Sequence, residues 1–117
     1  MTYNNFDEFR EARTKAQARL ENVEHLGLKR FLRMDAAAYE DRPEQHALDV
    51  KTRELLGLVA STVLRCDDCI NYHVEQCVNA GVSVPELEDA FNVAMIVGGS
   101  ITIPHIRRAM LMVDEVV

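Results

Sequence analysis

Residues 65–77 of the chain read Arg65-Cys66-Asp67-Asp68-Cys69-Ile70-Asn71-Tyr72-His73-Val74-Glu75-Gln76-Cys77. This stretch holds all three cysteines of the chain and one of its four histidines. An α-helix turns by about 100° per residue, so a helix here places Cys66, Cys69 and His73 on one face. Cys77 falls on the same face, and the acidic side chains fall on the other. The sequence therefore predicts a helix that presents thiols and an imidazole together, and the rest of the chain is interpreted as its scaffold.

Length and composition indicate a single ordinary globular domain. The 117 residues are enough for one hydrophobic core, and 48% of them are hydrophobic and 27% charged. The formal net charge of −6 repels nucleic acid and anionic membranes, so we expect neither as a partner. The first twenty residues are rich in charge, unlike a signal peptide. The longest apolar stretch, Leu55–Ala60, is too short to span a bilayer. We therefore expect a cytoplasmic protein.

The apolar periodicity is helical throughout, and the first third of the chain predicts two helices. Asn5 followed by Glu8 resembles a capping box at the start of the first helix, which we expect to break near Gly27. Apolar residues over 28–39 mark the second helix. The polar segment 41–46 is then a connector, too short to separate domains.

Four more helices are predicted in the remainder of the chain. A helix over 50–63 is expected to bury Leu55, Leu56, Val59, Thr62 and Val63. The cysteine helix follows and ends at Ala80-Gly81. A capping box and a proline at Ser83-Val84-Pro85-Glu86 begin a fifth helix that ends at Gly98-Gly99, and Pro104 lies near the start of the last one. The prediction is an all-α single domain, residues 1–117, of about six helices.

Cys66 and Cys69 form the strongest candidate site. In a helical Cys-x-x-Cys the α-carbons lie about 5–5.5 Å apart, which suits a disulfide. In a reducing compartment such a pair is more typical of redox chemistry or metal binding than of a structural cross-link. The helix N-terminus favours a Cys66 thiolate, whereas Asp67 and Asp68 oppose it. The alternative is that both cysteines are small buried hydrophobic residues.

His73 and Glu54 are candidates for proton transfer. His73 follows Cys69 by one turn, and an imidazole can take the thiol proton and return it to a leaving oxygen. The alternative is a core histidine bonded to a backbone carbonyl. Glu54, in the first turn of its helix, is explained most simply by the helix dipole. If the two helices pack antiparallel, however, Glu54 approaches His73 and orients its ring. From these residues alone the structural interpretation of Glu54 is the stronger.

The other cysteine and histidines carry less signal. Core packing is the better interpretation of Cys77, and surface or helix-end roles are expected for the remaining histidines, His25, His46 and His105. Cys66, Cys69 and His73 are ligands of zinc-compatible type. Structural zinc sites usually gather ligands from two chain segments, and no second pair is evident, so metal binding is disfavoured.

The spacing of four residues resembles a known signature. Eleven residues separate Glu54 from Cys66-x-x-Cys69, and three more precede His73. This pattern is similar to that of the carboxymuconolactone decarboxylase superfamily, in its alkylhydroperoxidase D (AhpD-like) branch. The resemblance covers about half the chain, from Leu48 to Met110. It includes two flanking segments, Lys51-Thr52-Arg53-Glu54-Leu55 and Gly98-Gly99-Ser100 to Pro104-His105.

The resemblance implies a fold, an activity and partners. It implies N-terminal helices over 1–47 and a family core over 48–110, in which the cysteine helix packs on the glutamate helix. Relatives of this kind form homo-oligomers, commonly trimers or hexamers. In the AhpD-like branch the two cysteines, here Cys66 and Cys69, reduce peroxides or disulfides, while Glu54 and His73 relay protons. No bound cofactor is expected, and an external dithiol protein, lipoyl or thioredoxin-like, serves as reductant.

One position departs from the AhpD-like pattern, and two other functions stay open. AhpD carries a histidine immediately before the second cysteine, where this chain has Asp68, and an acidic neighbour disfavours the thiolate. The decarboxylase branch typically lacks the cysteine pair, so we expect an antioxidant peroxidase acting on peroxides. The first alternative is a lyase acting on a lactone carboxylate with Glu54 and His73 as acid and base. The second is a non-catalytic or metal-binding oligomer.

Overall fold

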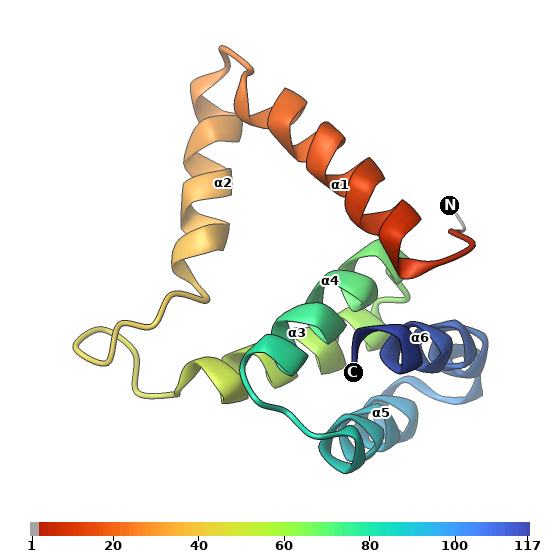
Figure 1. Cartoon of the computed structure of the whole chain (residues 1–117). Coiled ribbons are helices and arrows are strands. Elements are labelled where there is room, and N and C mark those ends of the chain that lie inside the picture. Colours follow the sequence, from red (N-terminus) through yellow and green to blue (C-terminus); the bar gives the residue numbers. More distant parts are fainter. Residues whose placement is uncertain (1–2) are drawn as a thin grey trace.

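A computed structural model describes residues 3–117 of the chain. This range contains six α-helices, one short 3₁₀ turn and no strand (Figure 1). The elements in chain order are α1 (Phe6–Glu21), α2 (Leu26–Ala37), α3 (Val50–Val63), α4 (Asp67–Asn79), α5 (Val84–Gly98), η1 (Ser100–Thr102) and α6 (Ile103–Val116). The predicted all-α class and single domain are confirmed.

Helices α3 to α6 form the body of the molecule. α3 packs against α4 and α5, and α6 packs against the other side of α4. The nine side chains at the centre of the core come mainly from these helices: Leu58, Ile70, Val74, Cys77, Val82, Leu87, Phe91, Ala109 and Val113. The cysteine helix α4 is therefore held between two others, which fixes the direction of its side chains.

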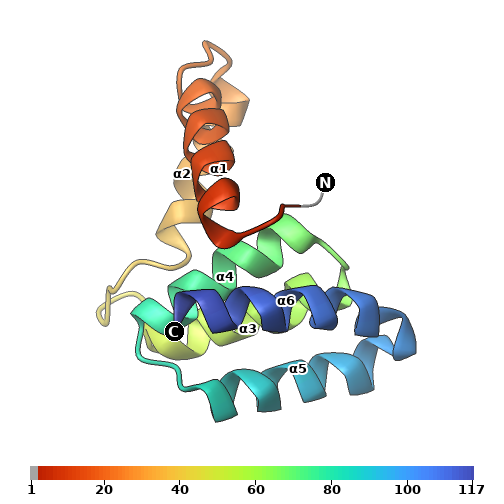
Figure 2. The same ribbon diagram turned by 45° about the vertical axis from the view of Figure 1, so that its right-hand side comes forward.

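Helices α1 and α2 form an N-terminal arm, residues 6–37, that stands away from the body (Figure 2). Only the start of α1 is anchored in the described chain: Phe6 and Phe9 are buried against Met112 of α6. Arg10 also pairs with Glu75 of α4. α2 buries none of its side chains. The arm thus meets the body at the level of α4 and α6.

Side-chain caps determine where several helices begin. The Asn5 side chain accepts a hydrogen bond from the Glu8 N–H at 2.8 Å, as predicted. The capping box of Ser83 and Glu86 is also present. Cys66 is itself the N-cap of α4, because its sulfur accepts the Cys69 N–H at 3.3 Å. These caps explain why the predicted starts agree with the structure.

Two local predictions about the helices are wrong. The first break is not at Gly27: α1 ends at Glu21, and His25 caps α2 by accepting the Leu28 N–H at 3.3 Å. Leu56 is also not buried, since 55% of it is exposed, while Leu58 is fully buried. Because α3 packs against both α4 and α5, the side chains that it buries differ from those that the apolar periodicity predicts.

Candidate active site

Cys66 and Cys69 are joined as a disulfide across the first turn of α4, with their α-carbons 5.3 Å apart. The chain turns from α3 into α4 within a few residues, and Arg65 makes this possible by adopting a left-handed conformation, φ 61°. It is the one non-glycine residue of the described chain with positive φ, a costly conformation that often occurs at functional sites. The Cys66 N–H then donates to the Ser61 carbonyl at 3.1 Å. The spacing predicted for the pair is thus realised at a tightly held turn.

His73 and Glu54 form a buried hydrogen-bonded pair between α4 and α3. His73 Nδ1 lies 2.8 Å from Glu54 Oε1, and the two residues are 7% and 3% exposed. Because a carboxylate only accepts, Nδ1–H donates to it and Nε2 is left to exchange a proton. The low dielectric strengthens this contact. Glu54 therefore orients the imidazole, in the arrangement required of a base and its supporting group.

Gly57 is a site residue that the sequence interpretation missed. A β-carbon on Gly57 would lie 2.6 Å from His73 Cε1, far inside contact distance, so the ring packs directly on the α3 backbone. The rings of Tyr39 and Tyr72 flank the imidazole, each with its centroid 5.1 Å away. The His73 ring is thus enclosed on several sides. A glycine inside an apolar helix stretch carries no sequence signal that identifies the side chain it accommodates.

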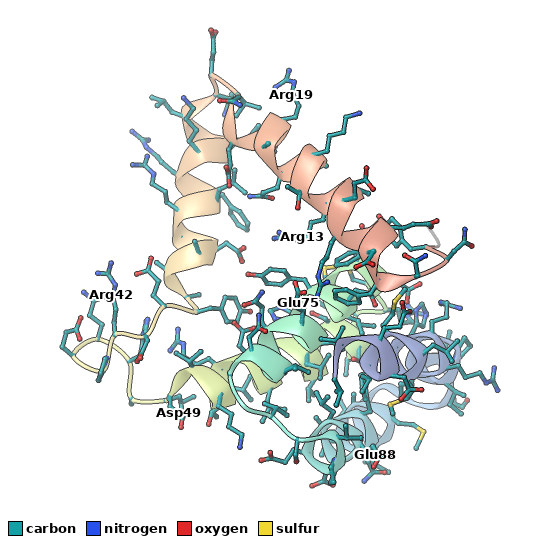
Figure 3. All side chains as sticks on the ribbon, in the orientation of Figure 1. Arg13, Arg19, Arg42, Asp49, Glu75 and Glu88 are labelled. Atoms are coloured by element: carbon teal, nitrogen blue, oxygen red, sulfur yellow. A yellow bond between two sulfur atoms is a disulfide. The ribbon has the colours of Figure 1, made fainter. Side chains whose placement is uncertain are left out.

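A cavity of about 350 Å³ opens beside the cysteines, between the arm and α4. Both Cys69 and His73 line it, so a molecule in the cavity can meet the sulfur and the imidazole together. Figure 3 shows Arg13 extending from α1 toward this space, and its guanidinium lies 4.2 Å from the centre of the Tyr72 ring. The remaining lining residues are Tyr3, Phe9, Ala12, Ala16, Gln17, Leu20, Asp35, Tyr39 and Asp68.

Burial keeps the hydroxyl groups and the third thiol near the site protonated. Burial, and then the charge of Glu54, raises the pKa of both Tyr39 and Tyr72, so these phenols remain hydrogen-bond donors at neutral pH. The same two causes raise the pKa of Cys77 to about 12. Cys77 is completely buried. The prediction that it packs in the core is confirmed.

A second histidine–carboxylate contact lies at the start of α4. His105 Nδ1 is 2.7 Å from Asp67 Oδ1, and Arg108 donates to Asp67 Oδ2 from two nitrogens, at 3.2 and 3.0 Å. His105 lies in the first turn of α6, as expected of a helix-end residue, but the sequence did not predict its contact with a carboxylate. The contact joins residues 38 positions apart, so it depends on how α6 packs against α4. The helix-end roles expected of His25 and His46 are confirmed: His25 caps α2, and His46 Nε2 lies 3.1 Å from the Ala37 carbonyl.

Residues 3–117 contain no group of three or more His, Cys, Asp or Glu side chains placed to hold a metal ion. Within the same range, no helix has the length and apolar character needed to cross a membrane.

The fold and the site define a class of protein: an all-helical domain with a Cys-x-x-Cys pair beside a carboxylate-supported imidazole. Residues 27–111 match the model of the carboxymuconolactone decarboxylase family, and the chain belongs to this family. The match begins inside α2. Members of the family are enzymes of decarboxylase or peroxidase-like type. No curated protein matches the chain.

Solved structures similar to this chain include proteins of Thermotoga maritima and Legionella pneumophila. The protein TM1620 of Thermotoga maritima, a family member for which a role in the antioxidative response has been suggested, is 49% identical. One structure of it has a TM-score of 0.84 and aligns over 92% of this chain and 88% of its own. A second has a TM-score of 0.86, with 93% and 92% covered. The family protein lpg0406 of Legionella pneumophila, solved in its apo form, is 24% identical, has a TM-score of 0.81 with 94% and 95% covered, and shows the shared fold.

The structure therefore brings the four predicted site residues into one region. Cys66 and Cys69 are bonded, and Glu54 contacts His73, which shares a cavity with Cys69. Their catalytic roles stay predictions.

Proposed function

We propose that the protein is a thiol–disulfide oxidoreductase that reduces peroxides in the cytoplasm, with Cys66 and Cys69 as its redox couple. The observation that carries the proposal is the shared cavity of Cys69 and His73, with His73 supported by Glu54. A peroxide in this cavity meets a nucleophile and a proton source at once, which is the arrangement that thiol peroxidation needs. The role suggested for the Thermotoga relative points the same way.

The first half of the reaction forms the disulfide. In the reduced protein His73 takes the proton of the Cys69 thiol, and the sulfur attacks one peroxide oxygen. The O–O bond breaks, the departing alkoxide receives the proton from His73, and Cys69 becomes a sulfenic acid. The Cys66 thiol then condenses with it, an S–S bond forms, and water leaves. Cys69 is assigned as the nucleophile because it lines the cavity with His73.

The second half of the reaction needs an external dithiol protein, lipoyl or thioredoxin-like. One of its thiolates attacks the Cys66–Cys69 disulfide and forms a mixed disulfide, and its second thiol resolves this to release both protein thiols. Two electrons and two protons pass from the reductant to the protein in each turnover. No bound cofactor enters either half.

The proposal is tested by mass spectrometry on fully reduced, chelator-washed protein treated briefly with stoichiometric peroxide. We expect a loss of two hydrogens located in the peptides of Cys66 and Cys69. Cys69→Ser should abolish peroxide consumption, whereas Cys66→Ser should stop at a sulfenic acid on Cys69. Cys77→Ala is the matched control, because it removes a thiol outside the cavity and should leave the reaction intact.

Proton relay is tested separately with Glu54→Gln and His73→Gln. We expect peroxide consumption to fall by about a hundredfold to ten-thousandfold, the usual contribution of a positioned acid–base group. Thiols that remain reduced in the wild-type protein would refute the proposal. In that case an assay for lactone decarboxylation becomes the relevant measurement, because Glu54 and His73 could serve such a reaction without the cysteines.

A further inference from the structure

The first turn of α4 carries an ion cluster that the proposed peroxidase mechanism does not use. Asp67 is the residue directly after Cys66, and both of its carboxylate oxygens are engaged by α6. Oδ1 lies 2.7 Å from His105 Nδ1, and Oδ2 accepts from Arg108 Nε and Nη2 at 3.2 and 3.0 Å. The side chains of Asp67 and His105 are 30% and 19% exposed. The cluster is thus partly shielded from solvent, and its carboxylate belongs to the residue that follows Cys66 in the chain.

The charge of this cluster acts on the Cys66 sulfur. An unpaired carboxylate at Asp67 would oppose a negative sulfur next to it. The guanidinium of Arg108 offsets that charge. Solvent screens part of the effect, because the Arg108 side chain is 45% exposed. The cluster therefore makes an unfavourable acidic neighbour electrically neutral.

Regeneration of the dithiol is the step in which Cys66 must carry negative charge. Cys69 is exposed and is therefore the more accessible sulfur, whereas Cys66 is half-buried. The Cys66 sulfur also accepts a hydrogen bond from the Cys69 N–H. A reductant thiolate that attacks the Cys69 sulfur forms a new S–S bond to it and breaks the Cys66–Cys69 bond. The electron pair of the broken bond leaves with Cys66 as a thiolate. Disulfide exchange is faster when the leaving thiolate is more stable.

We propose that Arg108 and His105 are positioning residues that engage Asp67 and stabilise Cys66 as the leaving thiolate when a dithiol reduces the Cys66–Cys69 disulfide. The inference rests on the proposed redox function of the pair. Arg108 supplies the positive charge of the cluster. His105 holds Oδ1 of Asp67, and this leaves Oδ2 to Arg108.

Other charged groups lie near the same turn. Arg65 precedes Cys66 in the chain, and Asp68 from α4 accepts a hydrogen bond from the Tyr3 hydroxyl at 3.4 Å. Burial, and then the charge of Asp68, raises the pKa of Tyr3, so this phenol stays neutral. These groups are the same in the wild-type protein and in variants of the two residues that engage Asp67, so they do not produce a difference between them.

The test measures how fast dithiothreitol reduces the oxidised protein, with each rate divided by the wild-type rate at the same pH. Arg108→Gln should slow reduction by about two- to fivefold, a size typical of one screened charge acting on a leaving group. Arg108→Lys should recover part of the rate. His105→Gln should slow reduction less than Arg108→Gln, because it changes a positioning contact and keeps the Arg108 charge.

The neighbouring Arg107 provides the matched control, because it is exposed and forms none of the described ion pairs with Asp67. Arg107→Gln should reduce at the wild-type rate. Equal rates for Arg108→Gln and Arg107→Gln overturn the proposal, and so does an Arg108→Lys variant that is reduced no faster than Arg108→Gln, because the role of Arg108 would then be structural only. No peroxide is present, so these outcomes are independent of whether peroxide is the substrate.

Discussion

Gly57 determines how closely the Glu54–His73 pair can pack against α3. Because the imidazole already lies where a β-carbon would stand, Gly57→Ala must push the ring away from its place on Glu54. We expect peroxide consumption to fall at least about tenfold, since displacements of about 1 Å at a reacting group are costly. Alanine also favours the helix by about 1 kcal/mol over glycine.

The expected signature of Gly57→Ala is therefore a large loss of activity with a small loss of stability, because the helix propensity of alanine offsets part of the cost of displacing the buried ring. Steady-state peroxide consumption and thermal unfolding of the same preparation measure the two effects. Full activity in this variant would contradict the assignment of His73 as an oriented base.

The buried thiol of Cys77 should make the free energy of unfolding depend on pH in alkaline solution. Its pKa is raised from 9.0 to about 12 in the folded protein, so the unfolded chain releases this proton first as the pH rises. The stability that the buried neutral thiol contributes is complete below about pH 9 and is lost as the pH approaches about 12. The loss is at most about 1.4 kcal/mol per pH unit. We expect Cys77→Val, which has no ionisable group, to lose stability less steeply over this range.

Denaturant unfolding of reduced protein at several alkaline pH values tests this prediction. Three tyrosines with raised pKa values, Tyr3, Tyr39 and Tyr72, add a dependence of the same sign to both proteins, and so cancel in the comparison. Parallel stability curves for the wild type and Cys77→Val would show that Cys77 does not supply the alkaline dependence.

At the scale of elements, the attachment of the arm to the body depends on a small cluster. Phe9 is 2% exposed and packs with Phe6 and Met112, and it also lines the cavity beside Cys69. Phe9→Ala removes a large side chain from this contact and should lower the free energy of unfolding by about 3 kcal/mol. It should also weaken peroxide consumption, because α1 forms one wall of the cavity.

Denaturant unfolding and a peroxide assay measure the two effects of Phe9→Ala. Leu20→Ala is a suitable comparison, because Leu20 also lines the cavity but lies 37% exposed toward the far end of α1. It should cost much less stability. Equal losses in the two variants would show that the Phe9 cluster does not anchor the arm.

Helix positions could be predicted from the sequence because local signals determine them. The caps at Asn5 and Ser83 act over three residues, and both agree with the structure. The burial of Leu58 in place of Leu56 could not be predicted in the same way. Apolar residues of α3 occur on several of its faces, so the packing of α4 and α5 against it determines which of them are buried.

The candidate site likewise has one feature that local helix geometry determines and others that tertiary packing determines. The proximity of Cys66 and Cys69 follows from helix geometry alone. Contact between Glu54 and His73 requires α3 and α4 to pack together, and family resemblance supplied that expectation. The partnership of His105 with Asp67 and the close approach at Gly57 depend on tertiary packing that neither periodicity nor spacing reveals.

At the scale of the whole molecule, two exposed apolar surfaces lie apart from the core. The first is on α2 and comprises Leu26, Leu28, Phe31 and Met34, which are 46–64% exposed. The second covers the end of α5 and η1 and comprises Val93, Ile96, Val97 and Ile101, which are 48–76% exposed. Monomeric proteins seldom leave such patches uncovered. We therefore propose that copies of the chain cover them in a homo-oligomer, a trimer or a hexamer.

Light scattering after size exclusion should accordingly give the mass of three or six chains of 13.3 kDa. Ile96→Lys and Phe31→Glu each place a charge in one patch, where burial would be costly, so each should shift the protein to a smaller species. Gln45→Lys, in the exposed connector between α2 and α3, adds a charge outside both patches and should keep the wild-type mass. A hexamer that becomes a trimer in only one patch variant would assign that patch to the contact between trimers. A wild-type chain that is monomeric at all accessible concentrations would contradict the proposal, and the arm would then be held only by its contacts within one chain, those of Phe6, Phe9, Arg10 and Arg13.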